Sequence, residues 1–145
     1  MALRKIITEE NEILYKKSRP VEKFDEKLGI LIDDMIETMR KAKGVGLAAP
    51  QIGILRRIVV IEIDNQLIEL VNPKIIESSG EQKEDEGCLS CPGFYAKTLR
   101  PSYVKVTGFD RFGNTVTYHG ENLKARAFCH ELDHLDGVLF KSRLV

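Results

Sequence analysis

The 145-residue sequence predicts an α+β fold, with antiparallel or mixed β-sheets around a helix near the C-terminus. Three observations predict it: an amphipathic segment at residues 24–43, several β-type segments in the middle of the chain, and helical spacing at residues 122–135. The strands stand between an early and a late helix instead of alternating with helices, which favours α+β over a parallel α/β fold. The length suits one domain, and we expect it to cover residues 1–145.

The first predicted helix spans residues 24–43. Asp25 is in position to cap its N-terminus, and Gly44 follows a basic last turn and is expected to end it. Apolar side chains recur at three- and four-residue steps, which predicts one buried face formed by Leu28, Leu31, Ile32, Met35, Ile36 and Met39.

Segments rich in β-branched residues predict the strands. The predicted strands are residues 57–63, 67–71, 74–78, 103–109 and 115–119. Asp64 and Asn65 join the first two, and residues 110–114 form a longer hairpin loop. The acidic residues 81–87 lead to Cys88 and carry no strand pattern.

The last predicted helix spans residues 122–135, with Asn122 as its cap and Gly137 as its terminator. At about 100° per residue, Leu123 and Ala127 lie on the same stripe as two later histidines. The opposite side should face the core through Phe128, Leu132 and Leu135.

This helix contains the run His-Glu-Leu-Asp-His at residues 130–134. Positions four apart share one helix face, so His130 and His134 can bind one metal ion, with Glu131 close enough to hold a water on that ion. Two of the chain's three histidines flank a glutamate at this spacing. The pattern favours a metallohydrolase over an ordinary solvated helix face.

The composition limits which binding partners and which cellular compartment we expect. The 22 basic and 22 acidic residues balance, so charge gives no reason to expect a nucleic-acid or membrane partner. Apolar stretches are too short to span a bilayer. The three cysteines are an odd number and no secretory signal is visible, so we expect a reducing compartment, the cytoplasm.

A catalytic site of this kind needs a third protein ligand. The candidates are Cys88, Cys91, Cys129, His119 and several carboxylates. Cys129 points about 100° away from His130, and His119 lies in a predicted strand at the surface. Cys88 follows Gly87, which permits an unusual backbone angle or a close approach, and it is the best candidate.

Other interpretations of the same residues stay open. Cys88 and Cys91 with the two histidines could form a closed Cys2His2 site, although 38 residues separate the two halves, against about 12 in a zinc finger. A redox pair is disfavoured because Pro92 suits a turn and not a helix start. A thermolysin-type peptidase would take a glutamate ligand from a later helix, and only 11 residues follow His134.

Residues 44–51 read Gly-Val-Gly-Leu-Ala-Ala-Pro-Gln. A dinucleotide-binding loop would need a strand before it and a helix after it, and this segment follows a helix instead. We expect it to line a cleft with its backbone. Gln51 would then supply a neutral amide suited to stabilising an oxyanion.

The motifs GVGLAAPQ (44–51), EGCLS (86–90) and HELDH (130–134) closely resemble the three signature motifs of peptide deformylases, in the same order and spacing. The resemblance extends from about residue 20 through residue 144. It implies hydrolytic removal of the formyl group from nascent N-formylmethionyl peptides, with transient proximity to the ribosome and no recognition of nucleic-acid sequence.

The resemblance also implies roles for individual residues. Cys88, His130 and His134 would bind one divalent ion, most often Fe2+, with Zn2+, Ni2+ or Co2+ as substitutes. Glu131 would be the general base and then the acid, and Gln51 and the Leu89 N–H would form the oxyanion hole. We expect the substrate to contact Val45, Gly46, Leu123 and Ala127. Two supporting contacts are further expectations: Glu86 orienting a ligand histidine, and Arg100 pairing with Asp133.

Overall fold

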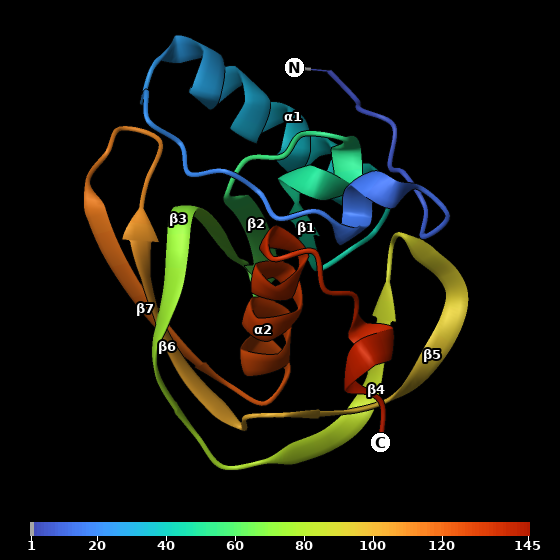
Figure 1. Ribbon diagram of the computed structural model, residues 1–145. Helices are drawn as coiled ribbons and strands as arrows, with labels where there is room; N and C mark the ends of the chain where they lie inside the picture. The colour runs from blue at the N-terminus through green and yellow to red at the C-terminus, as the bar shows by residue number, and fades with distance from the viewer. Residues whose placement is uncertain (1) are drawn as a thin grey trace.

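A computed structural model describes residues 2–145 and confirms the α+β fold (Figure 1). The helices are α1 (Glu26–Lys41) and α2 (Leu123–Leu135), with short 3-10 helices η1 (Glu12–Tyr15), η2 (Ala49–Ile52) and η3 (Phe140–Arg143). The strands are β1 (Gly46–Ala48), β2 (Ile58–Ile63), β3 (Gln66–Ser79), β4 (Gln82–Cys88), β5 (Cys91–Arg100), β6 (Tyr103–Phe109) and β7 (Thr115–Glu121).

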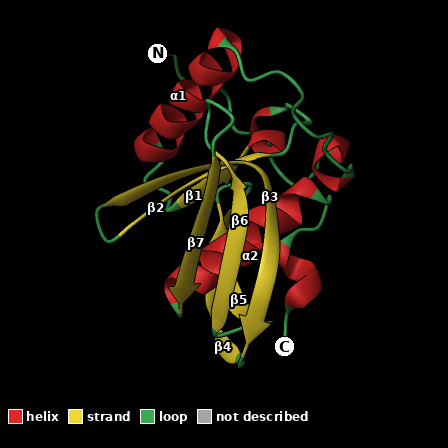
Figure 2. Cartoon of the chain, turned by 90° about the vertical axis from the view of Figure 1, so that its left-hand side faces the viewer, coloured by secondary structure: helices red, strands yellow, loops and turns green. Residues whose placement is uncertain are grey.

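The strands form two sheets. One has the order β1-β2-β3-β6-β7 and the other pairs β4 with β5, and every strand pairing within them is antiparallel. In Figure 1, α2 lies between the curved β3-β6-β7 part of the first sheet and the β4-β5 pair, and Figure 2 shows α2 behind the first sheet with α1 above it. The late helix is therefore central, as the sequence predicts.

The β2 strand is apolar except for Glu62 because both of its faces are buried. Val59, Ile61 and Ile63 belong to the cluster that includes Phe128, Leu132 and Leu135 of α2. Ile58 and Val60 belong to the cluster formed with α1. The core-facing residues predicted for both helices are confirmed, because α1 and α2 pack on opposite sides of this strand.

The β2–β3 turn is the one predicted at Asp64 and Asn65. Both residues have positive φ, 55° and 62°, as the tight hairpin turn with the right-handed strand twist requires. The predicted strands 67–71 and 74–78 are one strand, β3, with a pairing irregularity between Val71 and Lys74. Pro73 lies in this irregularity, where its missing N–H removes no ladder bond.

The α1 helix has the predicted N-cap but is shorter than predicted, spanning Glu26–Lys41 instead of residues 24–43. Asp25 Oδ1 accepts from the Leu28 N–H at 3.1 Å, which confirms the cap. At the other end, Lys43 takes the left-handed conformation, with φ of 60°, and the Gly44 N–H donates to Met39 O at 3.0 Å. Gly44 is thus not the left-handed terminator; its lack of a side chain serves contact with Leu89, where a β-carbon would lie 2.6 Å from Leu89 Cδ1.

Asn122 occupies the N-cap position of α2, as predicted, but it does not cap the helix through its side chain. Asn122 has φ of 54° and its side chain makes no capping bond, while its backbone oxygen accepts from the Arg126 N–H at 3.0 Å. The C-terminal prediction is confirmed. Gly137 has φ of 74°, and the Val138 N–H donates back to Asp133 O at 3.0 Å.

The β4–β5 hairpin was missed in the sequence. Its first strand is the acidic stretch, whose side chains are mostly exposed and show no apolar alternation. Gly87 serves close approach, because a β-carbon there would lie 2.4 Å from the Tyr95 ring on β5. The hairpin ends beside α2 and so brings Cys88 to the helix. No helix within residues 2–145 combines the length and apolar character needed to cross a membrane.

Candidate metal centre

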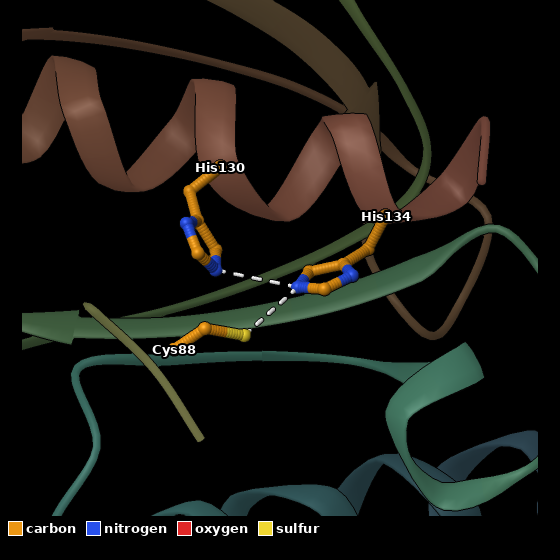
Figure 3. Close-up of side chains that lie close together, drawn as sticks. All are labelled: Cys88, His130 and His134. Carbon is orange, nitrogen blue, oxygen red and sulfur yellow. Dashed lines mark hydrogen bonds between the residues drawn. The ribbon is translucent and has the colours of Figure 1, made fainter. Parts of the chain in front are cut away.

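Three side chains from two elements converge on one point (Figure 3). Cys88 comes from the end of β4, and His130 and His134 lie one turn apart on α2. Cys88 Sγ lies 3.4 Å from His134 Nε2, and the two Nε2 atoms are 3.3 Å apart. Ligands about 2.0–2.3 Å from a tetrahedral ion would be separated by roughly 3.3–3.6 Å. These three residues could therefore hold one metal ion.

The other candidates for the third ligand lie elsewhere. Cys91 is buried with Leu14, Leu139 and Phe140 in a cluster that Cys88 also contacts, but it is not part of the group of possible ligands. Cys129 packs into the core cluster, and His119 is exposed on β7. Among residues 2–145 the group of possible ligands is Cys88 with the two histidines, so neither the closed Cys2His2 arrangement nor a thermolysin-type glutamate ligand is formed.

A buried carboxylate contacts His130 at the ring nitrogen that does not face the other ligands. Glu86 Oε2 lies 2.5 Å from His130 Nδ1, which directs His130 Nε2 towards the other two ligand atoms. Glu86 is fixed in turn by Thr98 Oγ1 at 2.7 Å and by Arg100, whose Nη2 lies 2.7 Å from Oε2. Arg100 also donates to Asp133 Oδ2 at 2.7 Å. Both expected supporting contacts are confirmed.

The charges of the centre favour a cation. Burial alone would raise the pKa of Glu86, but its hydrogen bonds with His130 and Arg100 lower it to about 2, so it stays ionised. Burial would lower the pKa of His130, yet Glu131, Cys88 and Glu86 raise it well above its ordinary value. Acidic groups therefore surround this imidazole, and a divalent ion would satisfy them in place of a proton.

His134 and Glu131 complete the fit to a metal. Burial lowers the pKa of His134 well below its ordinary value, which leaves the imidazole neutral with a lone pair for an ion. Burial raises the pKa of Glu131 to about 7. Glu131 Oε1 is buried and has no hydrogen-bond partner among the described residues, as expected for an atom that meets a water or substrate.

Gln51 is held rigidly beside the same centre. Its Oε1 accepts from the Ala48 N–H at 2.9 Å, while its Nε2 donates to Ser90 Oγ at 3.1 Å and lies 3.6 Å from Cys88 Sγ. The N–H of Leu89 has no protein acceptor within residues 2–145. Ser90 was missed in the sequence, where nothing marks its hydrogen bond to a residue 39 positions away.

A pocket of about 400 Å³ leads to these residues. Val45, Gly46, Leu123 and Ala127 all line it, together with Gln51, Cys88, Leu89, His130 and Glu131. Val45 and Leu123 are 45% and 43% exposed at its mouth, whereas Ala127 is buried. His134 is fully buried and does not line it. Tyr95 also lines it, as does Arg126, which the sequence did not indicate as a pocket residue.

The fold and the centre together define a class, that of hydrolases with an H-E-x-x-H metal helix. The family model for polypeptide deformylase matches residues 3–145. The chain is 51% identical to the peptide deformylase of Alkaliphilus metalliredigens, covering 100% of this chain and 99% of that protein. It is 54% identical to that of Caldicellulosiruptor bescii, covering 100% and 87%.

Solved structures that are similar to this chain belong to the same family. A peptide deformylase from Legionella pneumophila superposes with a TM-score of 0.96 at 48% identity, covering 99% of this chain and 87% of that one. The enzyme from Ehrlichia chaffeensis in complex with actinonin gives 0.97 at 35% identity, covering 100% and 90%. This chain belongs to the peptide deformylase family. It is an enzyme that removes the N-formyl group from nascent peptides, and the family's dependence on a metal agrees with the ligand group described above.

Proposed function

We propose that the chain hydrolyses the formamide of N-formylmethionyl peptides, releasing formate, with one divalent ion held by Cys88, His130 and His134. The observation that carries this assignment is the unpartnered, buried Oε1 of Glu131, which lies in the wall of the pocket beside the three ligand residues. A carboxylate with a free oxygen next to a metal centre is suited to proton transfer at a scissile bond.

Each residue of the centre would have its own role in the hydrolysis. When bound, the ion supplies Lewis-acid activation of water at neutral pH. Glu131 takes the proton of the attacking water and returns it to the departing amine. The Gln51 amide and the Leu89 N–H donate to the oxygen of the formyl group as negative charge develops on it. Ser90 and Ala48 hold Gln51, so this donor needs no reorganisation during the reaction.

The methionine side chain would occupy the apolar part of the pocket. Val45 and Leu123 provide exposed apolar surface at the mouth, and Ala127 provides a small buried side chain deeper in. Gly46 contributes backbone without a side chain, so the Glu131 carboxylate can lie directly against it. An unbranched, polarisable methionine side chain suits such a narrow apolar channel.

The ion we assign is Fe2+, with Zn2+, Ni2+ or Co2+ as functional substitutes. One thiolate with two imidazoles is a donor set that suits iron and zinc alike. We place the enzyme in the cytoplasm, in transient proximity to ribosomes that release its substrate. The three free cysteines agree with a reducing compartment.

The test is anaerobic purification from cells grown without added metal, elemental analysis, and an assay of formate release from formyl-Met-Ala-Ser. We expect one equivalent of iron and rapid formate release, lost on exposure to air and protected by replacement with nickel. Zinc as the sole metal in the active preparation would overturn the iron assignment. Absence of formate release from the fully metal-loaded enzyme would overturn the activity.

A further inference from the structure

Arg126 is a cation on the wall of the reaction pocket with no carboxylate partner. It lies on α2 one turn before His130, is half-buried, and lines the pocket together with Leu123 and Ala127. Within residues 2–145, no Asp or Glu oxygen comes within 4.0 Å of its guanidinium. Six other arginines do have such partners: Arg4, Arg40, Arg57, Arg100, Arg111 and Arg143. Arg19 and Arg56 also lack one, but they lie outside this pocket.

A neutral amide holds Arg126 in place. Its Nη1 donates to Gln82 Oε1 at 2.9 Å. The Gln82 amide is itself fixed, since its Nε2 donates to Pro101 O at 2.9 Å and to Asn122 O at 2.8 Å. A guanidinium has five N–H donors, so one edge is anchored and the other donors remain for a ligand. The arrangement positions the charge and leaves it uncompensated.

The position along the pocket indicates which part of a peptide would meet this charge. Arg126 precedes His130 by four residues, which is about 6 Å along a helix. An extended peptide advances about 3.3 Å per residue. The guanidinium is anchored to Gln82 at the start of β4, six residues before Cys88, so it lies towards the end of the pocket away from the metal centre. With the formyl group at the metal centre and the methionine side chain against Leu123 and Ala127, this charge is left for the second or third residue of the substrate.

Resting on the proposed function, we propose that Arg126 is a specificity-determining residue that binds a carboxylate at the second or third position of the formylated peptide. Arginine pairs with carboxylate through parallel N–H···O bonds in a fixed fork, which suits this class of side chain. Lys43 lines the same pocket and adds positive charge. Asp85 also lines it, but within residues 2–145 its carboxylate forms no ion pair with the Arg126 guanidinium.

The experiment compares isosteric substrates on the metal-loaded enzyme. Formyl-Met-Asp-Ala-amide and formyl-Met-Ala-Asp-amide are each compared with the Asn peptide of the same sequence, and the amide end removes the terminal carboxylate. At low salt we expect kcat/KM to favour Asp by about five- to tenfold at one of the two positions, as for a partly exposed charge pair. The preference should shrink as salt is added.

Two variants test whether Arg126 causes the preference for Asp over Asn peptides. In Arg126→Gln the Asp-to-Asn ratio should fall to about one, whereas Lys124→Gln removes a charge from the same helix outside the pocket and should keep the wild-type ratio. If Arg126→Gln does not fold, the wild-type enzyme provides the test through salt. An Asp-to-Asn ratio that stays constant as salt is added would then overturn the inference. An equal rate for Asp and Asn peptides, or an unchanged ratio in Arg126→Gln, overturns the inference. Failure of all four peptides to release formate would instead overturn the proposed function.

Discussion

Gly46 packs directly against the Glu131 carboxylate: a β-carbon at Gly46 would lie 2.5 Å from Glu131 Oε2. No real β-carbon approaches another atom that closely, so any side chain at position 46 must displace the carboxylate. The glycine-rich segment of the sequence therefore does more than line a cleft. Its backbone sets the position of the group to which we assign proton transfer.

Gly46→Ala should keep the metal and lose activity. Displacement of a catalytic group by about 1 Å can cost about 10²-fold in rate, and we expect a loss of this order in kcat. Gly29→Ala on α1 is the control, because its β-carbon would meet Arg111 at an ordinary 3.7 Å. Formate release and metal content are measured for both. Wild-type kcat in Gly46→Ala would contradict the proposed contact.

Glu86→Gln should weaken metal binding. The substitution removes the charge that faces His130 Nδ1, and loss of such a supporting carboxylate typically lowers metal affinity by about 10–100-fold. The nearby Glu84→Gln also removes one charge, but Glu84 is exposed and does not line the pocket, so the metal affinity of this variant should match the wild type. Competition with a chelator gives both constants. Equal affinities for Glu86→Gln and wild type would show that Glu86 does not support the ligand.

The two cysteines of the β4–β5 hairpin should behave differently. Cys88→Ser should lose the metal or bind it far more weakly, because a hydroxyl replaces the thiolate ligand. Cys91→Ser should keep metal and activity, because Cys91 packs in an apolar cluster and is not part of the ligand group, so an open position for water is preserved. Elemental analysis distinguishes them. Equal loss of metal from both variants would contradict the open site and support the closed site with four protein ligands.

Asp34 should contribute stability that disappears in acid. The Ala2 N–H at 2.8 Å, and then Arg4, lower the pKa of this buried carboxyl below its ordinary value of 3.8. A lowered folded-state pKa stabilises above the unfolded pKa, and the effect is lost as pH falls below about 4. Asp34→Asn should therefore reduce the free energy of unfolding at pH 7 by about 1–2 kcal/mol, allowing for the exposure of Arg4.

The measurement is the difference in unfolding free energy between wild type and Asp34→Asn, at pH 7 and at pH 2.5. Taking the difference cancels effects common to both proteins, including loss of metal in acid. We expect the gap to narrow towards zero at pH 2.5. A gap of constant size across this range would exclude the ionised carboxylate as its source.

Local patterns predicted much of this molecule. The ligand pair of α2 follows from helical spacing, and the Asp64–Asn65 turn follows from the two residues that tolerate positive φ. The β4–β5 hairpin could not be predicted, because its exposed, acidic first strand carries no alternation of apolar residues. The contacts of Gln51 with Ser90 and of Arg126 with Gln82 join residues 39 and 44 positions apart. Such contacts depend on tertiary packing and leave no local pattern in the chain.

The most direct test of the account is Glu131→Gln, assayed for metal content and formate release in the same preparation. The substitution keeps the shape of the side chain and removes the proton acceptor without removing a ligand. We expect full metal content and a fall in rate of about 10²–10⁴-fold, as for loss of a general base. Near wild-type formate release from the fully metal-loaded variant would contradict the central claim.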